Sequence, residues 1–200
     1  MAAPSKTAAV SLLALQNIAA SGNVAGSAYD ASVKFAANVM IHFGRKSSTA
    51  YTTAPTFRIE QSAKASGDGF WFPMAVFSPT LGALLTAQAV NGTCNAGQNV
   101  IAMTSTTNFS VGDVVYVSNG TLANSEWGRV KSVSSNTSIT LEDNLLNAQT
   151  GSTVYKGEMF LASLDLAGVT RLRLVDDNSG NSTAGGHDIE AFIVSLDSIG

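Results

Sequence analysis

The residues that could perform chemistry are few in this 200-residue chain, and they lie far apart. The chain has two histidines, His42 and His187, and one cysteine, Cys94. Neither histidine stands in a spacing typical of zinc ligands, and Cys94 has no histidine near it in the sequence. A Ser-His-Asp triad can be assembled from distant segments, but no GxSxG turn and no phosphate-binding glycine loop is present. We therefore expect no catalytic residue, no metal ion and no cofactor.

One acidic segment has some of the features of a cation site. Asp176 and Asp177 are followed by Asn178 and Gly180, as in part of a calcium loop, because hard cations bind several oxygen ligands. The spacing does not complete an EF-hand, and no glutamate follows where the bidentate ligand would stand. We interpret the segment as a hydrated hairpin loop.

Three consecutive aromatic residues could mark a binding face. On a strand, Phe70 and Phe72 share one face while Trp71 points the other way. We expect the two phenylalanines in the core and Trp71 at an interface; the alternative is a sugar-binding platform of the kind found in jelly-roll lectins. A second tryptophan, Trp127, is expected to fill or cover a small barrel in the middle of the chain.

The charge content excludes binding through a nucleic-acid backbone. The chain is 45% hydrophobic and only 12% charged, with a net charge of −3. Its basic residues are scattered; the nearest approach to a cluster is Arg45-Lys46, with Arg171 and Arg173 on one face of an expected strand. We interpret both pairs as solvated edges or intersubunit contacts.

The N-terminal segment after Lys6 superficially resembles a signal peptide, but Ser11, Gln16 and Asn17 interrupt its apolar run. No stretch reaches the roughly 18 apolar residues that a membrane-spanning helix needs. We therefore expect neither a cleaved leader nor a membrane partner. A single cysteine also allows no intramolecular disulfide.

Strand patterns dominate the chain. Apolar and polar residues alternate with a period of two, which is typical of half-buried strands. The expected long strands are 31–43, 57–65, 70–77, 169–175 and 188–196.

The middle of the chain has shorter strands separated by turn residues such as Asn119-Gly120. The five expected strands are 99–105, 113–119, 127–133, 137–143 and 152–156. Five short strands in about 65 residues predict a small closed barrel of SH3-like or OB-like type. An OB-like barrel often binds single-stranded nucleic acid, but Arg129 and Lys131 are outnumbered by acidic residues between 89 and 155.

These patterns predict an all-β protein: an antiparallel β-sandwich, jelly-roll-like, with an inserted five-stranded β-barrel and an N-terminal arm. The expected boundaries are 1–30 for the arm, 31–88 with 156–200 for the discontinuous sandwich, and 89–155 for the barrel. The arm is ambiguous, because its leucines suit either a short amphipathic helix or an extended segment. Outside the sandwich it would need apolar cover from a neighbouring subunit.

Three stretches resemble the structural proteins of tailed bacteriophage virions. They are VKFAANVMIHFGR…TFRIEQSAKASGDGFWFPMAVF, FSVGDVVYVSN…EWGRVKSVSSNTSITLEDNL and VTRLRLV…IEAFIVSL. Within that class the chain is most similar to a capsid decoration, or cement, protein. Two alternatives stay open: a head–tail connector, neck or tail-tube protein, and a carbohydrate-binding module of a phage fibre.

The resemblance implies a non-enzymatic protein that bridges major capsid subunits or binds other virion proteins. We expect neither nucleic acid nor a membrane among its partners. It also implies a homo-oligomer, a trimer or dimer, assembled into virions in the cytoplasm of a bacterial host. The residues that we expect at subunit interfaces are Leu12, Leu13, Leu15, Ile18, Arg45, Lys46 and Trp71.

Overall fold

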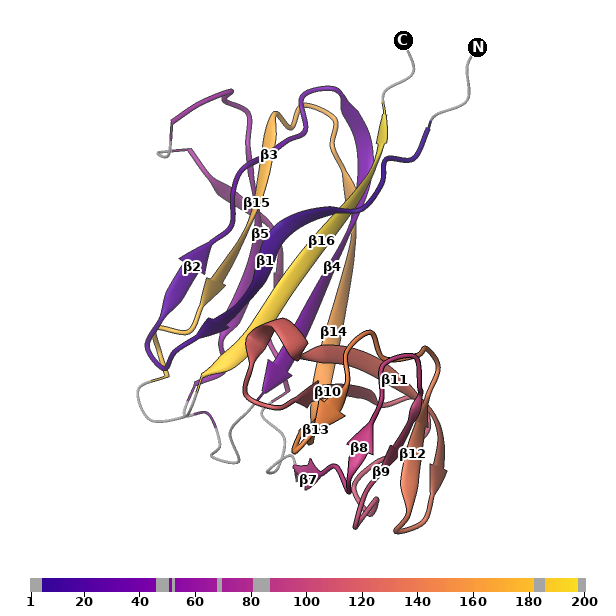
Figure 1. The fold of residues 1–200 in the computed structure, drawn as a ribbon. Coiled ribbons are helices and arrows are strands. Elements are labelled where there is room, and N and C mark those ends of the chain that lie inside the picture. The colour runs from indigo at the N-terminus through magenta and orange to yellow at the C-terminus, as the bar shows by residue number, and fades with distance from the viewer. Residues whose placement is uncertain are drawn as a thin grey trace.

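The computed structural model describes residues 5–45, 51, 53–67, 70–80, 87–181 and 186–197. Within these residues the regular elements are antiparallel β-strands and one short 3-10 helix, η1 (Leu122–Asn124). Figure 1 shows two bodies, a tall sandwich and a smaller barrel at its lower end. The all-β class expected from the period-two patterns is confirmed.

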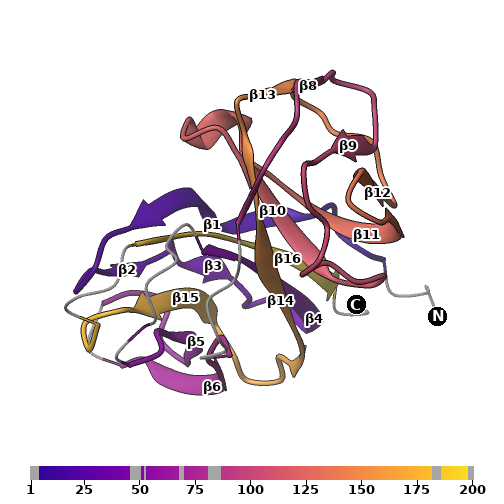
Figure 2. The same cartoon turned by 90° about the horizontal axis from the view of Figure 1, so that it is seen from below.

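The sandwich consists of two sheets packed face to face (Figures 1 and 2). Sheet I has the order β1 (Val10–Ile18), β16 (His187–Asp197), β4 (Lys34–Arg45) and β14 (Thr153–Asp165). Sheet II has the order β2 (Asn23–Ala25), β15 (Arg171–Asp177), β5 (Thr56–Ser62) and β6 (Phe72–Phe77), and β3 (Tyr29–Asp30) also pairs with β15.

The strand order is that of a jelly roll. Because β2 and β3 both pair with β15, they act as one strand, and the sandwich then has eight strands in chain order. Sheet I contains the first, eighth, third and sixth of these, and sheet II contains the second, seventh, fourth and fifth. This interleaving is the arrangement of an eight-stranded jelly roll and confirms the predicted sandwich type.

Alternation along the strands builds the core between the sheets. Val39, Ile41 and Phe43 of β4 point inward and are fully buried, opposite Phe57 and Ile59 of β5. Burying one such side chain contributes about 1.5–3 kcal/mol, so this stripe is a principal source of stability.

The N-terminal segment differs from the expected arm. Residues 10–18 form β1, which pairs with β16 at the edge of sheet I, so the segment is part of the sandwich. The register shifts between Ser11 and Leu13 and again before Gln16. These bulges turn the consecutive Leu12 and Leu13 both inward, which regular alternation would forbid. The helix-like spacing of the leucines is therefore a property of a bulged strand.

The barrel is inserted between β6 and the sandwich part of β14, and it has its own core. Its strands are β7 (Gln88–Ala89), β9 (Val100–Ala102), β10 (Val114–Ser118), β11 (Glu126–Ser134), β12 (Ser138–Leu141) and the start of β14. They run in the order β14-β10-β11-β12-β9, and the circle closes where Val90 bridges Met103 beside the β7–β14 pair. Two further short strands, β8 (Thr93–Cys94) and β13 (Gln149–Thr150), pair with each other. The five strands expected in this region are all present.

A single strand joins the two bodies. In β14, residues 153–156 pair with β10 of the barrel, whereas residues 157–165 pair with β4 of the sandwich. The ends of the insertion are adjacent, because Ala89 and Thr153 are register partners. The barrel is thus an extension of sheet I rather than a body on a separate linker.

Candidate subunit interface

Most of the N-terminal residues expected at an interface lie inside the chain's own core. Leu12, Leu13 and Ile18 are buried among the inward-facing residues of the sandwich, and Leu15 is half-buried. Sheet II therefore supplies the apolar cover that the sequence required, which leaves only Leu15 of this group with surface to offer a neighbour.

The sequence led us to expect Arg45 in an exposed loop, but the structure places it elsewhere. It is the last residue of β4, only 2% of it is exposed, and its guanidinium lies 4.4 Å from the ring centroid of Tyr51. A cation held over an aromatic face in a dry environment is favourable, so burial here has a physical reason. Lys46 lies outside the described residues.

Contrary to our expectation, the two phenylalanines of the three consecutive aromatic residues are not buried in the core. Phe72 is 62% exposed and Phe70 is also exposed, whereas Trp71 is half-buried beneath two guanidinium groups. Arg171 and Arg173 lie 4.7 and 4.3 Å from the Trp71 ring centroid. The register shift between β5 and β6 at Ile59/Glu60 makes Phe72 the partner of Gln61, on the same face as the buried Ile59, but Phe72 is the first residue of β6 and stays exposed there.

His187 and part of the acidic loop are buried, which their polar sequence context did not indicate. His187 is the first residue of β16 and is fully buried, with Nε2 2.6 Å from a carboxylate oxygen of Asp176. Its Nδ1 lies 3.4 Å from the Tyr51 hydroxyl. Asp176 and Asn178 are fully buried, so this part of the expected hydrated loop belongs to the core. No local pattern reveals the cluster, because Asp176 and His187 stand on two successive strands and Tyr51 comes from a distant segment.

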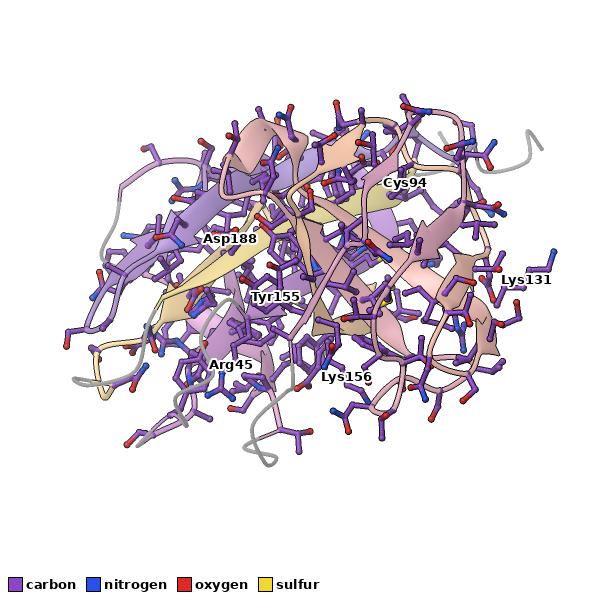
Figure 3. The ribbon with its side chains drawn as sticks, turned by 60° about the horizontal axis from the view of Figure 1, so that its bottom comes forward. Arg45, Cys94, Lys131, Tyr155, Lys156 and Asp188 are labelled. Carbon is purple, nitrogen blue, oxygen red and sulfur yellow. The ribbon has the colours of Figure 1, made fainter. Side chains whose placement is uncertain are left out.

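A second buried carboxylate ties the barrel to the sandwich. Asp188 accepts hydrogen bonds from the Tyr116 hydroxyl of β10 and from the Asn17 side-chain amide of β1, the latter at 2.8 Å. Burial, together with the bond to Asp188, raises the pKa of Tyr116. Figure 3 shows Asp188 on β16, and Lys131 pointing away from the barrel into solvent. Apart from Asn17, the members of both polar clusters are buried, so both clusters serve to hold strands in place.

The barrel sits on the outer face of sheet I, which we define as the side turned away from sheet II (Figure 2). The ring of Tyr116 lies over Gly44, and the ring of Trp127 lies beside Gly157. Trp127 also packs against His42, with 5.5 Å between ring centroids. Sequence analysis placed Trp127 within the barrel or at its edge; its contacts with His42 and Gly157 place it at the joint with the sandwich.

The rest of the outer face is strongly apolar. Met40, Phe192 and Leu161 form one row across β4, β16 and β14, because Met40 is the register partner of both others. Leu161 is 64% exposed, Met40 and Met159 are also exposed, and Phe192 is half-buried. Exposed apolar side chains gathered on one sheet face are typical of an interaction surface.

A groove crosses the same face next to this row. It has a volume of about 460 Å³, and its floor is low because the small Ala36 lies between Leu196 and Asp165. Lys6 forms an isolated antiparallel β-bridge with Leu196, so it lies at one end of that row and Asp165 lies at the other. Within the described part of the chain neither Lys6 nor Asp165 has an ion-pair partner.

The signal for this face was present in the sequence. The runs MFLASL in β14 and AFIVSL in β16 are almost continuously apolar instead of alternating. Continuous apolar strands are typical of sheets covered on both faces. Sheet I is covered by sheet II on one side only, so the pattern indicates a surface that lacks its cover in the single chain.

Other kinds of site are not seen in the described residues. These contain no group of three or more histidine, cysteine, aspartate or glutamate side chains placed to hold a metal ion. Among them there is also no helix with the length and apolar character needed to span a membrane.

Comparisons with known proteins give little further information. No family model matches the chain, and no curated protein is similar to it in sequence. One similar solved structure is that of the SPBc2 prophage-derived protein YomS, with a TM-score of 0.30 and 10% sequence identity, covering 98% of this chain and 97% of that chain. The function has to be inferred from the geometry of the chain itself.

Proposed function

We propose that this chain is a non-enzymatic structural protein of a tailed-phage virion, and that its role is capsid decoration. As a decoration protein it bridges neighbouring major capsid subunits on the head. The observation that carries the proposal is the apolar outer face of sheet I on a jelly roll. Apolar burial contributes roughly 25 cal/mol per Å², whereas an exposed ion pair contributes only about 0–1 kcal/mol. A surface of this chemistry favours lasting assembly.

Two arginines of sheet II support the expectation that nucleic acid is not a partner. Arg173 pairs with Glu60 at 2.8 Å, and Arg58 pairs with Asp177 at 3.0 Å and with Glu60 at 3.3 Å. Because these guanidinium groups are already neutralised within the chain, they offer little attraction to a phosphate backbone.

The test is the number of copies in purified virions of a phage that encodes the chain. Quantitative gel analysis against the major capsid protein is expected to give hundreds of copies per particle. Six or twelve copies would reject decoration and favour a neck or connector protein, and rings or tubes formed by the purified protein would favour the neck or tail role.

A surface variant ties the copy number to the outer face. Leu161→Asp places a charge in the middle of the apolar row and is expected to lower incorporation into virions at least tenfold. The matched control is Val76→Asp, since Val76 is 55% exposed on the outward side of sheet II, far from this row. Equal incorporation of both variants would show that assembly into the virion does not depend on the outer face.

A further inference from the structure

The barrel limits what can approach the outer face of sheet I. The β10–β11 hairpin starts at β14, passes over Gly44 and Gly157, and its η1 turn lies against β1. The barrel therefore forms a wall across the full width of the sheet at one end (Figures 1 and 2). The open part of the face runs from this wall to the opposite end of the sandwich, which we call the far pole.

The open face alone is too small for a stable interface. Across its four strands the open face is about 14 Å wide, and along β4 from Ala36 to His42 it is about 20 Å long. Its area is therefore roughly 300 Å² per copy. Stable interfaces bury about 800 Å² on each partner. An occupant must therefore touch a second surface, and the barrel wall is the surface next to the face.

The far pole carries the apolar groups that suit such a second contact. Val33 immediately precedes β4 and Phe35 is the second residue of β4, and both are more than half exposed. A second copy laid on the outer face with its strands running in the opposite direction brings its far pole against the first copy's barrel wall. With strands in the same direction, its lower end would instead meet the space that the barrel fills.

The charges on the face are also complementary in this arrangement. The row containing Lys6, Leu196, Ala36 and Asp165 then faces the row containing Glu190 and His42 of the other copy. Lys6 lies one strand spacing, about 4.8 Å, to the side of Glu190 across the interface, within reach of a lysine side chain. A two-fold axis produces each contact twice.

We propose that the outer face of sheet I binds a second copy of this chain in an antiparallel two-fold dimer, in which each barrel wall covers the far pole of its partner. The proposal rests on the proposed function, because it names the partner of the same assembly surface. This dimer is the unit that bridges capsid subunits. Its two chains exclude water from the outer face of sheet I and from the far pole of each copy.

The first test is sedimentation velocity of the purified full chain from about 1 to 200 µM. A monomer–dimer equilibrium is expected, with Leu161→Asp weakening the dimer at least 100-fold because a charge is left buried and unpaired. Val76→Asp is expected to dimerise like the original chain. A monomer at every concentration, or equal effects of the two variants, would overturn the proposal; circular dichroism establishes that both variants are folded.

Charge exchange tests the orientation of the two copies. Lys6→Glu is expected to weaken the dimer by about tenfold, and the added change Glu190→Lys is expected to restore it. In a parallel dimer Lys6 would face Asp165 instead, so restoration by Asp165→Lys and not by Glu190→Lys would overturn the antiparallel arrangement.

The dimer and the virion role can fail separately. A dimer that dissociates on Leu161→Asp, in a protein absent from virions, would reject the proposed function and leave the interface standing. A chain present at hundreds of copies per virion but monomeric at 200 µM would reject the dimer alone.

Discussion

Gly44 of β4 and Gly157 of β14 are register partners, and each lies beneath an aromatic ring of the barrel. A Cβ at position 44 would lie 2.5–2.9 Å from three ring atoms of Tyr116. At position 157 it would lie 3.2 Å from Trp127 and 3.0 Å from the Phe43 carbonyl oxygen. Because neither glycine has a side chain, the aromatic rings of the barrel pack directly against the backbone of sheet I at these two positions.

Gly44→Ala is expected to lower the free energy of unfolding by about 3 kcal/mol, because the buried Tyr116 ring has no room to move aside. Urea denaturation measures the change. Gly128→Ala is the comparison: its Cβ would approach a terminal methyl of Leu141, which can shift, so its cost should be smaller. In a double-mutant cycle with Tyr116→Leu, a coupling energy below about 0.5 kcal/mol would disprove the steric explanation.

Asp176→Ala is expected to destabilise the fold by about 2 kcal/mol or more, because it leaves the fully buried His187 without its closest partner. The adjacent Asp177→Ala should cost less than about 1 kcal/mol, since its pair with Arg58 is partly exposed. The apolar double variant Asp176→Leu/His187→Phe should recover much of the loss. Equal costs for the two aspartates in urea denaturation would contradict this ranking.

Stability is expected to fall at alkaline pH because of two buried tyrosines. Burial raises the pKa of Tyr51 and of Tyr116 above the ordinary value, so both stay protonated in the fold. Once the pH exceeds about 10, the unfolded chain loses these protons and the folded chain does not. Each tyrosine then removes up to about 1.4 kcal/mol of stability per pH unit, and below pH 10 neither contributes to the slope.

Replacing either tyrosine by phenylalanine should flatten this alkaline slope. Urea denaturation of Tyr51→Phe and Tyr116→Phe between pH 9 and 11.5 gives the free energy of unfolding at each pH. A slope that matches the original chain in both variants would show that other groups cause the alkaline loss.

Cys94 reports on the opening of the barrel. It is buried in the barrel core, its Sγ donates to the Val100 carbonyl oxygen at 3.3 Å, and burial raises the pKa of the thiol. Reaction with a thiol reagent such as DTNB should therefore be slow in the folded chain. Leu141→Ala, in the barrel core, is expected to speed it about 30-fold or more.

The matched control is Leu172→Ala in the sandwich core, which should leave the labelling rate of Cys94 unchanged because the two cores are separate. Equal acceleration by both variants would mean that the barrel and the sandwich open as one unit.

Long regular strands were predictable because their patterns are local. The alternation at 31–43 and 188–196 corresponds to β4 and β16, and the turn residues of the middle region mark all five barrel strands. The class of fold follows from such repetition. The two-layer packing also followed, because antiparallel strands must cover one another's apolar faces, whereas the order of the strands within each sheet did not.

Irregular positions were not predictable from local pattern. One extra residue reverses every side chain beyond it, so the bulges around Leu12-Leu13 turned both leucines inward, against regular alternation. Burial of charged groups was missed for a different reason. Arg45 and His187 depend on Tyr51 and on Asp176, which come from separate segments.

The course of β14 has a mechanical consequence for the whole chain. Its first residues are hydrogen-bonded to the barrel and its last residues to β4, without a flexible joint at Lys156-Gly157. A force that pulls the barrel along this strand acts on the β14–β4 ladder in shear, so its hydrogen bonds share the load instead of opening one at a time. Pulled at a right angle, the same joint is held chiefly by Tyr116 and Trp127, and it is weakest in that direction.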